Sequence, residues 1–169
     1  MSRLRRIEVS RRAFFVTTHF SKLSLPVSEA ERDIVLSSLA TARSHRKFLL
    51  VAYVVMPTHC HLLFEPESGD ALGAVIREIK VSTAKRILSA RARPGPFWQA
   101  RSHDRVLRNR TEWSKAVEYI HWNPVKDGLV RKPGDWPWSS WGGYVPGGQP
   151  PIPIDRIELP ADERAPLAW

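Results

Sequence analysis

The chain has 169 residues, 43% of them apolar and 25% charged, which is enough for one globular domain with a buried core. Its 26 Lys and Arg against 17 Asp and Glu give a net charge of +9, which favours a polyanionic partner such as a nucleic acid. The single cysteine excludes an internal disulfide and a cysteine-based zinc cluster, and no apolar run is long enough to span a bilayer. We therefore expect a cytoplasmic protein without a membrane partner.

Residues 1–12 are strongly basic. One interpretation is an arm that binds a phosphate backbone and gains free energy by counterion release. The other is a solvated chain terminus, and the sequence leaves both open. The candidate DNA-binding residues of this arm are Arg3, Arg5, Arg6, Arg11 and Arg12.

Residues 13–20, AFFVTTHF, are rich in aromatic and β-branched residues and predict a first strand. Ser28 followed by Glu31 resembles a capping box, and the apolar residues after it predict a helix to about Ser44. The nearly continuous apolar run 48–55 predicts a central strand, covered on both faces or packed under helices.

The next stretch, MPTHCHLLFEP (56–66), holds two histidines two positions apart. Pro57 marks a turn, and the following residues resume extended structure as the antiparallel partner of the preceding strand. Because side chains alternate along a strand, His59 and His61 share one face, and Cys60 lies on the other. Two neighbouring imidazoles can hold a divalent metal ion, but the pair is equally compatible with a strand edge without a metal.

A long helix is predicted from an N-cap at Asp70 to about Ala92. Its cations either follow a phosphate backbone or form a solvated helix face. The candidate DNA-binding residues of this helix are Arg77, Lys80, Lys85 and Arg86.

Residues 94–102 read as a loop whose Phe97 and Trp98 close the core or, as the less favoured alternative, stack on unpaired bases. A short strand is predicted over 103–108. The pair His103 and Asp104 is a candidate for supporting a nearby metal site from behind its ligands.

Asn109 or Thr111 caps a further helix that runs to about Trp122, where Pro124 is expected to end it. Tyr119 and Asn123 are four positions apart, so they lie on the same side of that helix. Gly128 then permits a left-handed turn.

After Val130 the chain becomes rich in Pro and Gly. We expect residues 1–145 to form one domain and residues 146–169 to form an extension that wraps it. The tryptophans expected to anchor the first part of this region are Trp136, Trp138 and Trp141.

Two stretches together resemble a known family. MPTHCHLLFEP is similar to the histidine–hydrophobe–histidine motif of the single-tyrosine HUH nucleases, with Cys60 at the middle position. The segment 119–130, Tyr-Ile-x-x-Asn-Pro-Val-x-x-Gly-Leu-Val, resembles the tyrosine half of the same family. Both are similar to the REP-associated tyrosine transposases, and the likeness covers roughly residues 12–145.

The resemblance implies an α+β fold, a ferredoxin-like or RRM-like antiparallel sheet flanked by helices, with the catalytic tyrosine on a helix. It implies that Tyr119 is the nucleophile and that His59, His61 and Asn123 hold Mg²⁺ or Mn²⁺. The implied activity is cleavage and transfer of single-stranded or hairpin DNA through a 5′-phosphotyrosine. Within this resemblance a monomer is favoured, and a dimer remains open.

Two other functions stay open at this level. The chain could be a hairpin DNA- or RNA-binding module without catalysis, or a metal-dependent hydrolase of small phosphate esters. Tyr53 and Tyr144 are alternative tyrosines, but the first lies in an apolar strand and the second in a glycine-rich loop.

Overall fold

The computed structural model describes residues 12–24, 26–66, 71–91 and 95–157. Its elements are β1 (Ala13–Phe20), α1 (Glu29–His45), β2 (Phe48–Val55), β3 (His59–Pro66), α2 (Ala71–Ala90), β4 (Trp98–Leu107) and α3 (Arg110–Lys126). Short 3-10 helices cover Lys22–Ser24, Pro133–Asp135 and Trp141–Tyr144. The expected helix cap Asp70, the end of the extension and most of the basic arm (Arg3, Arg5, Arg6 and Arg11) lie outside the described residues.

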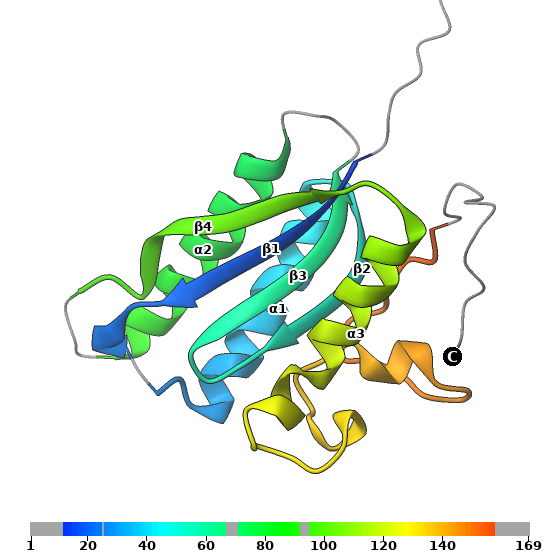
Figure 1. Cartoon of the computed structure of the whole chain (residues 1–169). Helices are drawn as coiled ribbons and strands as arrows, with labels where there is room; N and C mark the ends of the chain where they lie inside the picture. Colours follow the sequence, from blue (N-terminus) through cyan, green and yellow to red (C-terminus); the bar gives the residue numbers. More distant parts are fainter. Residues whose placement is uncertain (1–11, 25, 67–70, 92–94, 158–169) are drawn as a thin grey trace, which may run out of the picture.

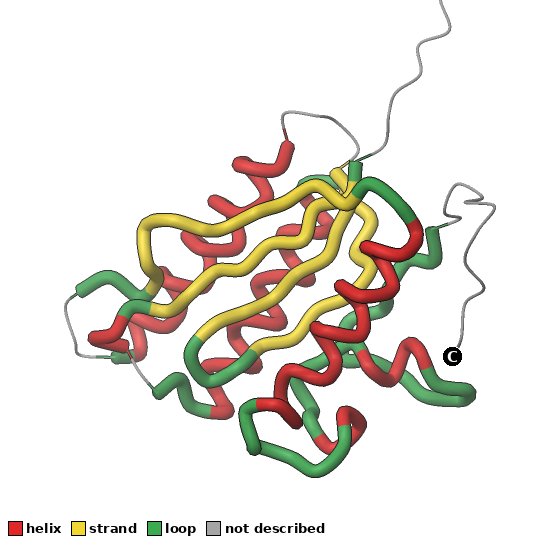
Figure 2. The backbone as a smooth tube through the Cα atoms, viewed as in Figure 1, coloured by secondary structure: helices red, strands yellow, loops and turns green. Residues whose placement is uncertain are grey.

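The four strands form one antiparallel sheet in the order β2-β3-β1-β4. Helices α1 and α2 lie together on one face of the sheet, and α3 lies on the other (Figures 1 and 2). This arrangement confirms the predicted α+β fold of ferredoxin-like type. No helix within the described ranges has the length and apolar character needed to cross a membrane.

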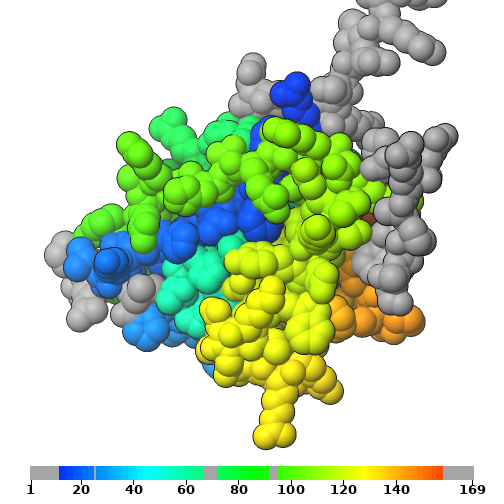
Figure 3. All heavy atoms as spheres, in the orientation of Figure 1, coloured from blue at the N-terminus to red at the C-terminus, as the bar shows by residue number. Residues whose placement is uncertain are grey.

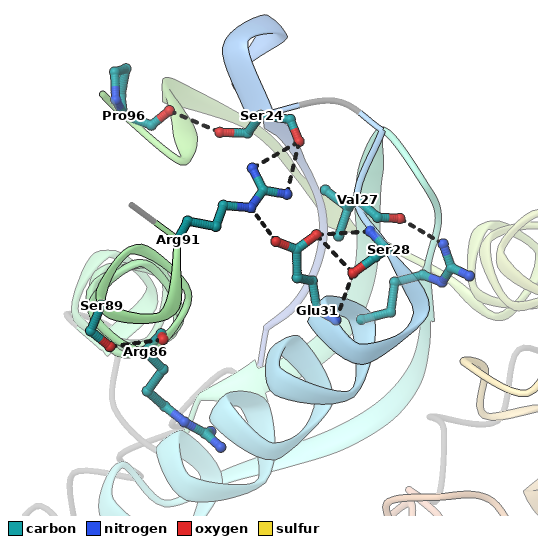
Figure 4. A network of polar contacts seen from close by, with 9 residues as sticks. Ser24, Val27, Ser28, Glu31, Arg86, Ser89, Arg91 and Pro96 are labelled. Atoms are coloured by element: carbon teal, nitrogen blue, oxygen red, sulfur yellow. Dashed lines mark hydrogen bonds and ion pairs between the residues drawn. The ribbon is translucent and has the colours of Figure 1, made fainter. Parts of the chain in front are cut away.

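The start of α1 is the capping box that the sequence predicts. The Ser28 backbone N–H donates to Glu31 Oε2 over 2.8 Å, and the Glu31 N–H donates to Ser28 Oγ over 3.3 Å. Arg91 follows α2 and donates to the Glu31 carboxylate and to the Ser24 carbonyl (Figure 4). The network therefore ties the end of α2 to the beginning of α1.

The apolar strand β2 lies at an edge of the sheet, so its predicted central position is wrong. Its outer edge is covered by the chain after α3, because the Val55 N–H donates to the Trp138 carbonyl over 2.8 Å. The Ser140 N–H donates to the Tyr53 carbonyl over 3.0 Å. Further along, Asp155 accepts from the Leu50 N–H over 2.8 Å and pairs with Arg43 at 2.7 Å. The C-terminal segment buries β2 in the way that a fifth strand would.

The strand β4 begins at Trp98, five residues earlier than the sequence predicts. Trp98 pairs with Phe20 on β1, and its indole N–H donates to the Lys80 carbonyl on α2 over 3.1 Å. Phe97 and Trp98 are 1% and 7% exposed, so the core interpretation is right and neither ring is free to stack on a base. Because of this packing, residues 98–102 of the expected loop belong to the sheet.

The helix α3 continues through Pro124 to Lys126, so the predicted stop at this proline is wrong. Proline lacks the N–H of an intrahelical bond, but its fixed φ suits a helix and one lost bond does not end it. The Asp127 N–H still donates to the Asn123 carbonyl over 3.0 Å, and Gly128 takes the predicted left-handed turn with φ of 70°. Asn123 therefore belongs to the last turns of a continuous helix.

Trp136 and Trp138 anchor the segment after α3, as predicted, and both are 9% exposed. Their indole N–H groups donate to the Val55 carbonyl over 3.1 Å and to Asp33 over 2.8 Å. The buried Arg32 guanidinium lies 3.9 Å from the centre of the Trp138 ring, a favourable cation–π arrangement. The segment is thereby fixed against α1 and β2.

Candidate active site

His59 and His61 lie on the β3 face that α3 covers in part. Their Nε2 atoms are 3.0 Å apart, so the two rings converge on one point. The Thr58 hydroxyl lies 2.8 Å from His59 Nδ1, and the Thr17 hydroxyl on β1 lies 2.9 Å from His61 Nδ1. A proton held on each Nδ1 by these hydroxyls leaves both Nε2 lone pairs free for a ligand.

Burial keeps the histidine pair neutral. It lowers the pKa of His61 to about 3, and the neighbouring His59 and His19 act in the same direction. Burial also lowers the pKa of His59, with a further contribution from His19, whose ring centre is 5.4 Å away. Neutral imidazoles are the form that binds a metal ion.

Tyr119 reaches the same point from α3. Its ring centre is 5.1 Å from that of His61 and 5.9 Å from that of Phe15, in edge-to-face contacts. The side chain is 41% exposed, and its hydroxyl makes no hydrogen bond to the described residues. Lys126, two turns further along α3, places its ammonium 4.8 Å from the Tyr119 ring centre. An exposed tyrosine side chain thus lies beside the histidine pair and next to a cation.

Asn123 lies one turn after Tyr119 and is only 4% exposed. Its amide is near enough to His59 to counteract part of the lowered pKa of that imidazole, as does Asp127. The Asn123 Oδ1 atom nevertheless has no well-formed hydrogen bond within the described ranges. A buried carbonyl oxygen without a partner costs free energy unless a bound group satisfies it.

These atoms fit a divalent cation. Two imidazole nitrogens that bind one ion at about 2.1 Å and at a right angle are about 3.0 Å apart, which is the separation of the His59 and His61 nitrogens. Within the described part of the chain, no three His, Cys, Asp or Glu side chains group as a metal site. The pair therefore depends on another type of ligand, and the unpartnered Asn123 oxygen is available beside it.

The family model of the transposases described as "Transposase IS200 like" matches residues 23–122, which include both histidines and the tyrosine. The chain belongs to this family of IS200-like transposases. It is thus an enzyme of the single-tyrosine HUH type.

Relatives of this transposase agree with the assignment. The REP-associated tyrosine transposase of Escherichia coli K12 is 29% identical over 167 residues, which cover 97% of this chain and 98% of that protein. A solved structure of a REP-associated tyrosine transposase bound to a REP hairpin matches with a TM-score of 0.72 and 26% identity, over 89% of each chain. A Deinococcus radiodurans structure shares the fold, with a TM-score of 0.53 at 17% identity over 76% of this chain and 98% of that chain.

The structure of this IS200-like transposase brings four of the predicted site residues together: His59, His61, Tyr119 and Asn123. The predicted DNA-binding helix α2 instead lies on the opposite face of the sheet (Figure 1). There Arg77 and Lys85 are exposed, Lys80 donates to the Gln99 carbonyl over 2.9 Å, and Arg86 donates to Ser37 over 2.5 Å. Arg12, the described residue of the basic arm, is exposed just before β1.

Sequence reasoning missed the two threonines and Lys126. Thr58 adjoins His59, and Lys126 follows Tyr119 by two helical turns, so spacing in the sequence could have identified both residues. Nothing in the sequence near His61 indicates Thr17, because the two residues meet only through the β1–β3 register. Of the expected supporting pair His103 and Asp104, neither contacts His59 or His61 directly, and His103 meets His19 instead, with ring centres 6.5 Å apart.

The sheet face that carries His59 and His61 is open beyond α3. In the space-filling view the side of this face formed by β1 and β4 is left uncovered by the helix (Figure 3). The side chains of Arg101, His103 and Arg105 on β4 are exposed. A polyanion that approaches Tyr119 from this side meets positive charge.

Proposed function

We propose that the chain is a metal-dependent endonuclease and strand transferase of single-stranded DNA that forms a 5′-phosphotyrosine on Tyr119. The single observation that carries this proposal is the convergence of the Tyr119 ring, 5.1 Å from His61, with two neutral imidazoles whose Nε2 atoms are 3.0 Å apart. A nucleophile beside a metal-ligand pair is the arrangement that phosphoryl transfer needs.

In the first step the Tyr119 oxygen attacks the scissile phosphorus. A phosphotyrosine ester forms, and the bond from phosphorus to the 3′ oxygen of the preceding nucleotide breaks. The phenol proton leaves to solvent and the departing 3′ oxygen takes up a proton, so the reaction is balanced without a co-reactant. The exposed position of Tyr119 and the ammonium of Lys126 beside its ring favour approach of a phosphate.

His59, His61 and Asn123 would hold the divalent cation, Mg²⁺ or Mn²⁺. When bound, it supplies positive charge that offsets the charge developing on the phosphate oxygens. The hydroxyls of Thr17 and Thr58 fix the orientation of the two rings by accepting from Nδ1.

In the second step a 3′-hydroxyl attacks the phosphotyrosine, a new phosphodiester forms, and Tyr119 regains its proton. The covalent link retains the energy of the broken bond, so the strand is rejoined or transferred without ATP. A hydrolase that used water would lose that energy. An open nucleophile without a hydrogen bond to hold it suits this exchange of partners.

The proposed substrate is hairpin DNA with single-stranded flanks. The solved relative is described as bound to a REP hairpin, and it is 26% identical over 89% of this chain. The net charge of +9 suits such a polyanion, and a DNA substrate implies a cytoplasmic protein. Because one chain supplies both the histidines and the tyrosine in contact, a monomer suffices for a complete site.

A labelled hairpin oligonucleotide with Mg²⁺ or Mn²⁺ tests the proposal. Wild type is expected to form an adduct that survives denaturing gel electrophoresis, and Tyr119→Phe is expected to form none while binding the hairpin equally well. Binding without cleavage by wild type would instead indicate a hairpin-binding module. Equal turnover of a small phosphate ester by wild type and Tyr119→Phe would indicate a hydrolase.

A further inference from the structure

The face of the sheet opposite the catalytic site carries a pocket between α2 and β4 that the proposed cleavage does not use. Its volume is about 470 Å³, within the range of small-molecule sites. Figures 1 and 2 show α2 behind β4, which is the free edge of the sheet. Side chains alternate along β4, so Ser102 and Asp104 line this pocket while His103 belongs to the catalytic face.

The walls of the pocket are apolar and partly open to solvent. Leu72 and Ile76 on α2 are half-buried, and Val81 is 58% exposed, a large fraction for a valine. Gly73 adds open space, because a Cβ built there meets no atom within 4 Å. A flat apolar ring would remove these side chains from water.

Unpaired polar groups complete the lining. Asp104 and Arg77 carry opposite charges on one pocket, yet neither forms an ion pair or hydrogen bond with the described residues. The Ser102 hydroxyl is buried and has no hydrogen-bond partner within the described ranges, and the same holds for Thr18, its cross-strand neighbour. A ligand with an apolar ring, hydrogen donors at one end and negative charge at the other matches this lining.

We infer that the pocket binds one unpaired nucleotide of the DNA flank, with Asp104 reading the base edge and Arg77 holding the phosphate. Asp104 selects guanine, because a carboxylate is only an acceptor and guanine alone among the bases presents two adjacent donors, N1–H and N2–H, on one edge. A single strand that passes round the free edge of β4 reaches both this pocket and Tyr119.

This inference rests on the proposed DNA function and adds a specificity site to it. The test is binding without cleavage, measured by fluorescence anisotropy with the full chain in EDTA. The probes are one hairpin oligonucleotide and versions in which each flank position carries guanine, adenine, cytosine, thymine or no base. Wild type is expected to prefer guanine at one flank position by about tenfold over the abasic probe.

Two variants test the pocket, one by changing its carboxylate and one by reducing its space. Asp104→Asn is expected to lower the affinity for the guanine probe about tenfold, to the level of the adenine probe, because an amide offers one acceptor and one donor. Gly73→Leu adds a side chain to the pocket lining where a Cβ meets no atom within 4 Å, and it replaces a helical glycine. This variant is expected to fold and to bind all probes like the abasic one. Asp135→Asn, far from β4 in sequence, is the matched control and keeps the wild-type preference.

The outcomes separate this inference from the proposed function. A wild type that binds hairpins without any flank-base preference overturns the pocket assignment and leaves cleavage by Tyr119 untouched. A guanine preference that survives both Asp104→Asn and Gly73→Leu overturns it as well. A wild type that binds no hairpin at all removes the DNA function on which the inference rests.

Discussion

Two clusters of tyrosine and histidine lie on two sides of α3, and they differ in how their polar groups are satisfied. In the buried cluster His121 Nε2 lies 2.8 Å from the Ser140 hydroxyl, and Tyr144 donates to the Val51 carbonyl over 2.8 Å. The Tyr53 hydroxyl accepts from the Ile152 N–H over 2.7 Å. Burial raises the pKa of Tyr53 to about 12 and also raises that of Tyr144.

The second cluster consists of the same residue types but has unused groups. The Tyr119 hydroxyl makes no hydrogen bond with the described residues, the Asn123 Oδ1 atom makes no well-formed one, and the two histidine Nε2 atoms face each other. A fully bonded tyrosine stabilises the fold and is held away from substrate, whereas an unbonded one can attack. Hydrogen-bond satisfaction, rather than residue type, therefore distinguishes the structural cluster from the proposed reactive one.

The largest expected effect comes from removing one of the two histidines proposed to bind the metal ion. His61→Ala is expected to lower DNA cleavage at least about a thousandfold, because it removes a primary cation ligand. Mn²⁺ at a hundredfold excess over its Kd is expected to raise the melting temperature of wild type by about 5–10 °C and that of His61→Ala very little. The exposed His45, changed to Gln, is the control and keeps both properties; loss of both in His45→Gln would contradict the assignment.

A smaller effect is expected from the threonine that orients His61. Thr17→Val keeps the shape but removes the hydroxyl 2.9 Å from Nδ1, and should weaken Mn²⁺ binding by about 10–100-fold. Isothermal titration with Mn²⁺ measures this change. Thr41→Val on α1, where the hydroxyl donates to the Ser37 carbonyl, is the matched control. Equal affinities of Thr17→Val and wild type would show that the hydroxyl has no part in cation binding.

The buried cluster should make the stability of the protein depend on pH. Burial lowers the pKa of His121 to about 4 from the 6.5 expected in the unfolded chain. The unfolded state thus binds a proton first, so stability is complete above pH 6.5 and falls as the pH drops towards 4. At pH 5 this histidine costs about 2 kcal/mol relative to pH 7. Urea unfolding at both pH values measures the free energy of unfolding. Between pH 7 and pH 5, His121→Gln should lose less of this free energy than wild type, by about 2 kcal/mol. An identical loss in both proteins would contradict the buried neutral state of His121.

The smallest effect sharpens the contrast between the two clusters. Tyr144→Phe removes one partly buried hydrogen bond and is expected to lower the free energy of unfolding by about 1 kcal/mol while leaving adduct formation at the wild-type level. Tyr119→Phe is expected to do the reverse. Urea unfolding and gel quantification of the adduct measure both variants. A loss of adduct in Tyr144→Phe under conditions where this variant is folded would contradict the structural role of Tyr144.

Local patterns in the sequence predicted the order of elements, the capping box at Ser28 and the shared face of His59 and His61. They also predicted that Tyr119 and Asn123 share one side of a helix. The features that were missed depend on contacts between distant segments. Thr17 reaches His61 only through strand register, the apolar strand β2 lies at the sheet edge under Asp155 and its neighbours, and the α2–β4 pocket exists only after packing.

The most direct test of the proposed chemistry is to identify the tyrosine that carries DNA. The chain has three tyrosines, and trypsin places them in separate peptides, 48–77, 116–126 and 132–156. After reaction with a hairpin oligonucleotide, nuclease trimming and mass spectrometry are expected to find the nucleotide, joined through its 5′-phosphate, on peptide 116–126 alone. A nucleotide on the peptide of Tyr53 or Tyr144, or a cleaved hairpin with no linked peptide at any time point, would contradict the role of Tyr119.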